Sequence, residues 1–573
     1  MREQLKISNL IILLPYLKPY RLKMLFAIIL MILGAICSIY LPMVTRKIID
    51  VHIVARDFRG VLITALIAVG LLAAISLTNA LRARLMALVG QNTIKRIRDD
   101  LFVKLQTLPV SFFDKIPVGK VITRLTSDVD AVSELVSNAI VSMVIDTLRL
   151  FGYLAVMFWL DWRLTIITLA FTPPLVFAMT YLNTKIRKAE DVVREETSIL
   201  NAYLQESISG LKVIQAFKSE RFFSDKFTNN NQDLLKASNR AVAIYGFFWP
   251  IVDICWLFST AIMIYFGAKW VVEGQTTIGT LMAFFAYNGQ FFGPLRGLSQ
   301  AYRIIVRALT GAVRINEIMA TAPETNNNLP AMPAINGKVE FKNVTFSYNK
   351  KDIVLKNINL VANPGETIAL VGHTGAGKTS IINILCRFYE PLEGQVLVDG
   401  NNIFNMELLS YRRQVALVLQ DPFLFSGSIR DNLAFGAPNA SDEEMMEALE
   451  TVGLKEQFAR TGITLDSILT ERGSNLSSGQ RQLLSFARAL LADPRILILD
   501  EATAYVDTLT EQKIQAALQT LLKGRTSFVI AHRLSTIRNA DQILVIDRGK
   551  ILEQGTHSEL LELKGEYWKL CNA

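Results

Sequence analysis

The chain has 573 residues, which is more than one domain usually holds. Hydrophobic residues make up 51% of it and the mean hydropathy is +0.32, yet 19% of the residues are charged. These values argue against a wholly soluble chain and against one that lies wholly in a membrane, so we expect one part of each kind. The net charge of +9 fits Lys and Arg beside membrane spans better than a nucleic-acid partner, which we do not expect. The four cysteines lie far apart without a C-x-x-C pair, which excludes the usual spacing of a disulfide framework or a zinc site.

The N-terminal half is dominated by apolar runs. The first, residues 7–17, is too short to cross a bilayer, and the basic residues beside it indicate a helix at the membrane interface. Six runs of spanning length follow, and we place them near residues 24–44, 61–81, 135–160, 164–182, 241–272 and 278–298. The first of these has no small-residue cleavage site with a mature domain behind it, so we expect no cleavable signal peptide.

The connections between the six runs alternate in length and charge. Long basic stretches, residues 82–134 and 183–240, follow the second and the fourth run, whereas short turns follow the third and the fifth. Because basic loops stay in the cytoplasm, we expect the N-terminus and everything after the sixth run to be cytoplasmic. Both long stretches are predicted to be polar helices that extend the spans into water as cytoplasmic bridges. Each bridge holds compact or apolar residues that we interpret as a docking knob: Phe112, Phe113 and residues 117–119 in the first bridge, and residues 210–217 in the second.

Four ionisable residues lie within the predicted spans, where a charge is costly in lipid: Asp146, Arg149, Asp253 and Arg296. Asp146 and Arg149 are one helical turn apart, so they either neutralise each other or line a substrate cavity. Two adjacent prolines, Pro173 and Pro174, predict a kink in the fourth span.

The pattern changes after the sixth run. Residues 323–336 are rich in Pro and Asn and have no apolar period, which is typical of a linker. From residue 337 short strand-like runs alternate with helical ones, which predicts a soluble α/β domain. We therefore divide the chain into a transmembrane domain at residues 1–322, a linker at 323–336 and a nucleotide-binding domain at 337–573.

The soluble domain contains a phosphate-binding loop at residues 372–379. Its sequence fits G-x-x-x-x-G-K-[ST] between a strand-like run and a helical one. Glycines let backbone N–H groups approach phosphate oxygens, and the helix directs its positive end at the same phosphates. Lys378 is expected to reach the β- and γ-phosphates, and the Thr379 hydroxyl is expected to bind Mg²⁺. The pattern predicts ATP or GTP binding, with a glycine-rich structural turn as the alternative. The residues concerned are Gly372, His373, Thr374, Gly375, Ala376, Gly377, Lys378, Thr379 and Ser380.

Two further segments carry chemistry. Residues 495–500 read as a buried parallel strand that ends in Asp500, a second expected ligand of Mg²⁺. Glu501 follows and is placed to orient or deprotonate a water molecule, although an acidic pair that caps a helix is the alternative. Ser477 is a good N-cap for a helix after it, whose exposed N–H groups would form an anion site. Taken alone, that segment is an ordinary capped helix.

Together these motifs resemble those of the ATP-binding cassette (ABC) transporters. The resemblance rests on residues 372–379, Gln420, the signature-like residues 476–480, Asp500 with Glu501, and His532, in this order. Six spans ahead of one cassette are similar to a half-exporter of the type B architecture, such as the multidrug resistance-like exporters of the Mdl type and the lipid A exporters. The implied fold is an α-helical six-span domain fused to an α/β P-loop ATPase.

The resemblance also implies residue roles. Tyr348 stacks on adenine, Gln420 senses the γ-phosphate and Mg²⁺, His532 contacts the γ-phosphate, and Asp507 crosses to the partner subunit. Ser477, Gly479 and Gln480 bind the nucleotide that the other subunit holds. The implied catalytic residues are Glu501, His532, Gln420 and Lys378, and the implied metal ligands are Thr379, Gln420 and Asp500.

Two departures from the family pattern concern the pairing of subunits. Ser478 replaces the usual signature glycine, and Ala504-Tyr505 replaces the usual Ser-Ala. They favour a heterodimer with a second half-transporter over a homodimer. The implied activity is that of an ATP-driven translocase in the bacterial inner membrane that exports hydrophobic or amphipathic compounds. A lipid or lipid A flippase and an ATP-gated channel or regulator are the alternatives.

Overall fold

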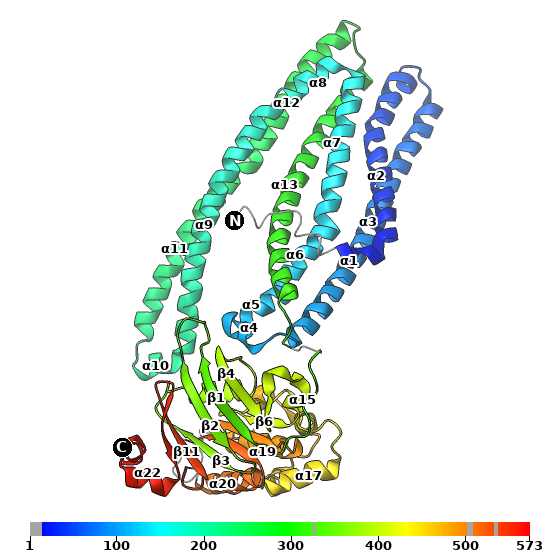
Figure 1. Cartoon of the computed structure of the whole chain (residues 1–573). Helices are drawn as coiled ribbons and strands as arrows, with labels where there is room; N and C mark the ends of the chain where they lie inside the picture. Colours follow the sequence, from blue (N-terminus) through cyan, green and yellow to red (C-terminus); the bar gives the residue numbers. More distant parts are fainter. Residues whose placement is uncertain (1–13, 325–327, 501–507, 532–536, 573) are drawn as a thin grey trace. The chain divides into compact units, whose positions relative to one another are not determined.

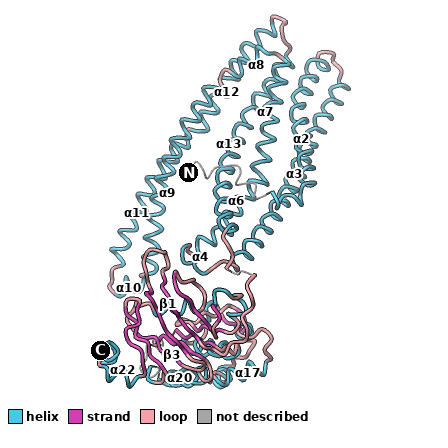
Figure 2. The backbone as a smooth tube through the Cα atoms, viewed as in Figure 1, coloured by secondary structure: helices cyan, strands magenta, loops and turns pink. Residues whose placement is uncertain are grey.

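The computed structural model describes residues 14–324, 328–500, 508–531 and 537–572. The chain divides into two compact units, and the tip of the first bridge belongs to the second of them. The first unit comprises Met1–Val103 and Gly119–Ala320, and the second comprises Lys104–Val118 and Thr321–Ala573. The first unit is helical, and the strands described in the chain gather in the second (Figures 1 and 2).

The first unit consists of long helices joined by short turns. In chain order its α-helices are α1 (Leu14–Leu17), α2 (Arg21–Lys47), α3 (Phe58–Gln106), α5 (Val118–Thr123), α6 (Val129–Glu134), α7 (Ile140–Leu160), α8 (Trp162–Leu169), α9 (Thr172–Ser209), α10 (Leu211–Ala216), α11 (Glu220–Gly246), α12 (Phe248–Val272) and α13 (Ile278–Ala320). A 3-10 turn, η3 (Lys18–Tyr20), precedes α2. Three π-helical turns, η4 (Ile48–Ile53), η5 (Arg124–Asp128) and η6 (Leu135–Ala139), extend α2 and link α5, α6 and α7. The predicted interfacial helix lies largely outside the described residues.

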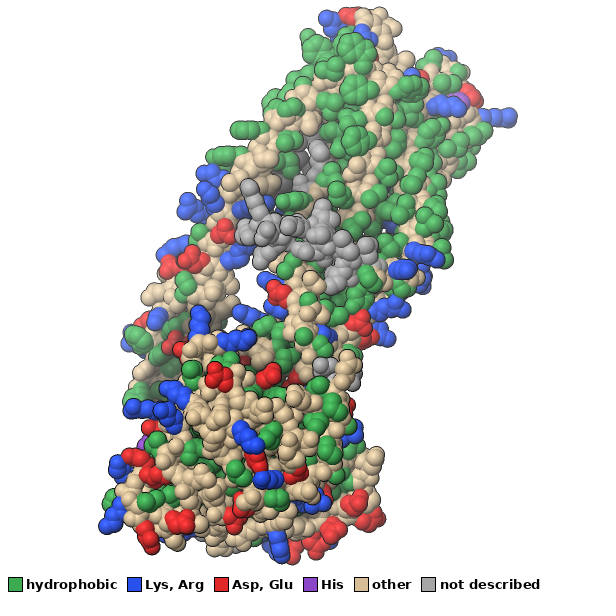
Figure 3. Space-filling view, in the orientation of Figure 1, with side chains coloured by type: hydrophobic (Ala, Val, Ile, Leu, Met, Phe, Trp, Pro, Cys, Tyr) green, Lys and Arg blue, Asp and Glu red, His purple; other side chains and the backbone are tan. Residues whose placement is uncertain are grey.

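Five of the described helical segments are long and apolar enough to cross a membrane. They are Pro15–Ile53, Phe58–Gln106, Val118–Leu160, Trp162–Ser209 and Asp253–Val272, and each overlaps one of the first five predicted runs. The sixth run lies in α13, a helix of 43 residues whose central side chains are only partly described. Hydrophobic side chains cover the outer faces of these helices (Figure 3), as expected for surfaces that face lipid.

The fourth run is broken where its prolines predict a kink. Helix α8 ends at Leu169, and α9 begins at Thr172 with proline in its first turn. Proline lacks an N–H and its ring clashes with the preceding turn, so it begins a helix more readily than it continues one. The short turn before α8 is held by Asp161, whose carboxylate accepts hydrogen bonds from the backbone N–H groups of Arg163 and Leu164 at 2.9 and 3.3 Å.

The charged residues of the spans lie among packed helices. Asp146 on α7 packs against α13 so closely that a Cβ atom at Gly297 would lie 1.8 Å from its carboxylate. The Nε atoms of Arg82 and Arg149 are buried without a hydrogen-bond partner among the described side chains. Asp253 is exposed, and the side chain of Arg296 is outside the described ones.

The second unit is built on two main sheets. An antiparallel sheet has the order β2-β1-β4-β5, and a six-stranded sheet has the order β12-β11-β3-β10-β9-β6, in which only β12 runs antiparallel to its neighbour. The strands are β1 (Val339–Phe346), β2 (Leu355–Ala362), β3 (Thr367–Val371), β4 (Glu393–Val398), β5 (Asn401–Asn402), β6 (Val415–Val418), β9 (Ile496–Asp500), β10 (Thr526–Ile530), β11 (Gln542–Asp547) and β12 (Lys550–Gly555). A small ladder joins β7 (Gly427–Ser428) to β8 (Ile468–Leu469).

Helices pack around the six-stranded sheet and against one another. They are α14 (Lys378–Leu385), α15 (Leu408–Arg412), α16 (Ile429–Ala434), α17 (Asp442–Thr451), α18 (Lys455–Thr461), α19 (Ser478–Leu491), α20 (Thr508–Leu522), α22 (His557–Leu563) and α23 (Glu566–Asn572), together with the 3-10 turns η7 (Ile403–Asn405) and η8 (Glu471–Gly473). The first bridge contributes α4 (Val110–Lys115). Strands β9 and β10 are apolar and buried on both faces, which is typical of central parallel strands.

The predicted linker belongs to the second unit and packs into its core. Met332 and Ile335 are buried in its core, and their backbone N–H groups each donate a 2.8 Å hydrogen bond, to Ser410 Oγ and Gln414 Oε1 respectively. The sequence of this segment has no periodic pattern, because these backbone N–H groups form hydrogen bonds with side chains of other elements and do not pair with a neighbouring strand. Its second half is therefore anchored and is not a free tether.

Candidate functional site

The phosphate-binding loop connects β3 to α14 in a backbone conformation that requires glycine. Gly372, Gly375 and Gly377 have φ angles of +150°, +82° and +113°. A Cβ atom at Gly372 would lie 2.0 Å from the carbonyl oxygen of Ile546, and one at Gly377 would lie 2.7 Å from a Leu355 methyl group. No other residue could close the loop this tightly. The loop thus forms a backbone cradle ahead of the positive end of α14.

Lys378 lies folded over this cradle. Its ammonium group donates hydrogen bonds to the carbonyl oxygens of Gly372, at 2.6 Å, and His373, at 3.0 Å, and the residue is 8% exposed. Burial lowers the pKa of Lys378, and the carboxylate of Asp500 partly opposes that shift. Among the described residues, two carbonyl oxygens accept hydrogen bonds from this buried ammonium group and one carboxylate lies near enough to influence it, so it is poised to bind further negative charge, as a phosphate would supply.

The other described site residues lie at the same edge of the sheet. Asp500 ends β9, in register with Ile530 of β10, and β10 in turn pairs with β3 ahead of the phosphate loop. Gln420 is exposed two residues beyond β6, the other neighbour of β9. Carboxyl ends of parallel strands meet at one edge, where ligands bind in open α/β sheets. The structure therefore gathers the phosphate loop, Asp500 and Gln420, whereas Glu501, Asp507 and His532 lie outside the described residues.

Tyr348 stands beside α14, where it contacts Ser380 of the predicted site and other neighbours that the sequence did not single out. Its hydroxyl lies 3.1 Å from Ser380 Oγ and accepts a hydrogen bond from Asn383 Nδ2 at 3.1 Å. Its ring meets those of Phe346 and Tyr389 edge to face, with centroids 4.7 and 4.9 Å apart. The residue is 41% exposed, so an aromatic surface remains open beside the phosphate loop.

The signature-like segment begins α19 as predicted. Ser477 is its N-cap: the hydroxyl accepts a hydrogen bond from Gln480 N, and the Gln480 side chain accepts one from Ser477 N at 2.9 Å. Gly479 is buried, whereas Ser477 and Ser478 are exposed. Among the described residues no hydrogen bond links this segment to the phosphate loop, so its exposed face is open to another molecule.

The residues present fit a nucleotide with Mg²⁺. The glycine cradle and Lys378 suit a phosphate chain, and Tyr348 suits a base. The Thr379 hydroxyl is exposed at the start of α14, and with Asp500 and Gln420 it forms a set of oxygen donors of the kind that Mg²⁺ prefers. When bound, the metal would neutralise charge on the phosphates; the chain supplies the positions of the donors.

The sequence reading missed one polar cluster behind the site. Arg412 on α15 forms a two-pronged ion pair with Glu324, at 2.9 and 2.6 Å, and donates to the carbonyl oxygens of Cys386 and Arg387 just beyond α14. Since Glu324 and Arg412 are 88 residues apart in sequence, no local pattern connects them.

Comparisons with known proteins agree with this geometry. The chain matches the family "ABC transporter transmembrane region" over residues 24–295 and the family "ABC transporter" over residues 355–504. A probable multidrug resistance ABC transporter ATP-binding/permease protein of Bacillus subtilis is 38% identical over 489 residues, which cover 85% of this chain and 73% of that protein. An ATP-dependent lipid A-core flippase of Syntrophus aciditrophicus is 36% identical over 491 residues, which cover 85% of this chain and 82% of that protein. The solved structure of a bacterial Atm1-family ABC exporter with ATP bound has a TM-score of 0.78 at 26% identity and covers 96% of this chain and 98% of that chain.

These matches confirm the predicted fold class, a helical transmembrane domain fused to an α/β ATPase, and the predicted ATPase activity coupled to transport. They also place the chain in membranes, where exporters of this type act as dimers. The chain belongs to the ABC transporters, as an exporter half-transporter that binds and hydrolyses ATP.

Proposed function

We propose that this half-transporter exports hydrophobic or amphipathic compounds of the multidrug type across a bacterial inner membrane. The observation that carries the proposal is the neutral polar network inside the first unit. The Tyr153 hydroxyl lies 2.8 Å from Ser38 Oγ and donates a 2.8 Å hydrogen bond to Gln290 Oε1. The Tyr287 hydroxyl donates a hydrogen bond to the carbonyl oxygen of Ile39 at 2.6 Å. Tyr153 and Tyr287 are buried, so these polar groups satisfy one another inside the helical unit and leave its accessible surface mainly apolar, which suits cargo that is largely apolar. The name of the Bacillus subtilis relative supports the same cargo class.

A lipid or lipid A flippase is the second candidate, supported by the name of the Syntrophus relative. In either case we infer that the N-terminus and the ATPase domain lie in the cytoplasm, because the basic bridges belong to that side. Two ATP-bound cassettes would close on each other and tilt the helices from an inward-open to an outward-open state, and hydrolysis would reset them.

Within the ATPase domain we infer that Thr379, Asp500 and Gln420 hold Mg²⁺ and that Lys378 binds the phosphates. Glu501 would act as the general base, and His532 would contact the γ-phosphate. The segment with Ser477, Gly479 and Gln480 would close over the partner's nucleotide.

The proposed cargo class is tested with the complex reconstituted in lipid vesicles. A panel of drugs and lipids is measured for stimulation of ATP hydrolysis and for movement into the vesicle lumen. Selective stimulation and uptake of structurally unrelated apolar drugs is expected, whereas stimulation by lipids alone would favour the flippase. An ion current far larger than the rate of ATP hydrolysis would show a channel instead.

We expect Phe113→Asp in the first bridge to leave ATP binding intact while transport fails. Phe112 and Phe113 meet edge to face on α4, with centroids 5.4 Å apart, within an otherwise polar segment. An apolar pair contributes no stabilising free energy on a helix that is surrounded by water. We therefore interpret the pair as the docking knob that transmits the conformational change from the ATPase domain to the spans. Nucleotide affinity, ATPase rate and uptake are measured together, with Phe113→Leu as the control that keeps an apolar side chain. Coupled transport in the Asp variant would rule out the knob.

We also infer that the working unit is a heterodimer with one strong and one weak ATP site. Ser478 is the first residue of α19 and is exposed, so it adds a side chain to the surface that this chain lends to its partner. A homodimer is the simpler alternative, since two-fold symmetry is the commonest assembly.

The chain expressed alone should therefore be poorly active, and a second half-transporter should restore its activity. Mass and ATPase rate of the purified chain measure this directly. A Ser478→Gly variant serves as the matched control, since it should raise the rate of any homodimer by removing the extra side chain. A stable homodimer of the native chain that exports cargo at full rate would disprove the heterodimer.

A further inference from the structure

A cavity of about 450 Å³ opens among α9, α11 and α13 in the first unit. Helix α9 lines it with residues at helical spacing, including Arg187 and Glu190, so one face of that helix is turned toward it. Tyr245 of α11 and Tyr302 and Arg303 of α13 complete the wall. The predicted apolar runs of α9 and α13 end at residues 182 and 298. From these ends we infer that the cavity lies where the spans pass from the hydrocarbon region to the headgroup region.

The charge of the cavity is unbalanced. Two guanidinium groups, of Arg187 and Arg303, face one carboxylate, that of Glu190. Glu190 accepts a hydrogen bond from the Tyr245 hydroxyl at 2.5 Å. Neither arginine forms a hydrogen bond or an ion pair with the side chains that the structure describes. The cavity thus carries a net charge of +1, two positive groups and one negative, with several N–H donors available for an anion.

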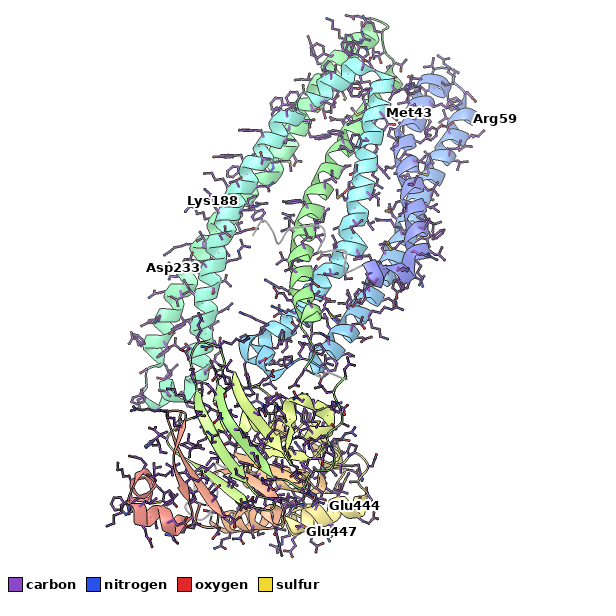
Figure 4. The ribbon with its side chains drawn as sticks, in the orientation of Figure 1. Met43, Arg59, Lys188, Asp233, Glu444 and Glu447 are labelled. Atoms are coloured by element: carbon purple, nitrogen blue, oxygen red, sulfur yellow. The ribbon has the colours of Figure 1, made fainter. Side chains whose placement is uncertain are left out.

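A simpler explanation is that basic residues at a membrane boundary often extend their charged ends to the lipid headgroups without binding a substrate. Lys188, the neighbour of Arg187 on α9 (Figure 4), fits that simpler explanation because it does not line the cavity. Arg187 and Arg303 differ, since both line one cavity from opposite helices beside two partly exposed tyrosine rings. A guanidinium group matches the geometry of a carboxylate or a phosphate, and a cationic head would be repelled here.

We propose that this cavity binds the anionic headgroup, a carboxylate or a phosphate, of an amphipathic substrate before transport. The proposal rests on the proposed export function and narrows its substrate class. The apolar tail of such a molecule would lie along the spans, while its head would replace water around Arg187 and Arg303. A neutral drug would gain nothing from the two guanidinium groups.

The test uses the full-length complex in nanodiscs of phosphatidylcholine and three amphiphiles with the same twelve-carbon chain. These are dodecyl phosphate, dodecanoate and dodecyltrimethylammonium. The concentration that gives half-maximal ATPase stimulation is measured for the native chain, for the double variant Arg187→Gln/Arg303→Gln and for Lys188→Gln. Comparing one amphiphile across variants cancels differences in its partition into the bilayer. The double variant Arg187→Lys/Arg303→Lys keeps the charge and removes the planar fork.

We expect the Gln double variant to need at least about tenfold more of either anionic amphiphile, because charge-assisted hydrogen bonds are lost. The Lys double variant should be intermediate, and Lys188→Gln should match the native chain. The response to the cationic amphiphile should not weaken in any variant. Equal responses of native chain and Gln variant, or an equal loss in Lys188→Gln, would overturn the anionic subsite. If no amphiphile of any charge stimulates hydrolysis in the nanodiscs, and none is taken up by the reconstituted vesicles, the export of amphiphiles itself fails. The two anionic compounds show which headgroup is preferred.

Discussion

Replacing Glu501 with Gln is expected to leave ATP bound and to remove nearly all turnover. Asp500 ends β9 at the carboxyl edge of the sheet, beside the phosphate loop and Lys378, and Glu501 is the next residue of the chain. Lys378, Thr379 and Asp500 are unchanged in the variant, so binding should persist. Loss of a general base typically lowers the rate about 10²–10⁴-fold.

The measurement is the ATPase rate together with nucleotide retention in the purified complex. Glu447→Gln on α17 provides a matched control (Figure 4), because it makes the same chemical change on an exposed residue of the same unit. The control should keep the native rate. Turnover near the native rate in the Glu501 variant would mean that another group activates the water molecule.

Features that depend on neighbouring residues could be predicted from the sequence. The phosphate loop is an example, because its glycines are required by positive φ angles that local spacing encodes. The N-cap at Ser477 is another, since the capping box needs only residues three apart. The break before Pro173 follows from the missing N–H of proline. In each case the chemistry lies within one helical turn.

Features that depend on distant residues could not be predicted. The order of the sheet strands brings Asp500 and Gln420 to one edge, yet no spacing in the sequence specifies that order. The burial of Met332 and Ile335 depends on partners about 80 residues away in the sequence. The local sequence of this segment therefore predicted only a linker. The cavity of the first unit joins three helices for the same reason. Side chains that meet only through tertiary packing leave no periodic signal.

The ion pair of Arg412 with Glu324 is the clearest of these hidden contacts. Arg412 donates to Glu324 through two nitrogens and to the carbonyl oxygens of Cys386 and Arg387, at 3.2 and 3.0 Å, where the helix after the phosphate loop ends. The backbone N–H of Glu324 donates to the carbonyl oxygen of Thr107 at 2.7 Å, at the end of α3. The Arg412 side chain therefore connects the end of the phosphate-loop helix to Glu324 in the linker, and the backbone of Glu324 connects the linker to the first bridge.

Arg412→Ala is expected to destabilise the second unit by about 2–3 kcal/mol, because it leaves a half-buried carboxylate and two helix-end carbonyl groups without their donor. The figure lies below that for a fully buried pair, since the side chains of Arg412 and Glu324 are 28% and 18% exposed. For a domain of this size such a loss lowers the thermal midpoint by about 4–12 °C. Thermal unfolding of the full-length chain measures it, with Arg413→Ala as the control, because Arg413 is exposed on the next position. The double variant Arg412→Ala/Glu324→Ala should lose less than the sum of the single variants, since the two side chains act as one contact. Equal midpoints for Arg412→Ala and Arg413→Ala would show that the contact does not hold the linker to the phosphate-loop helix.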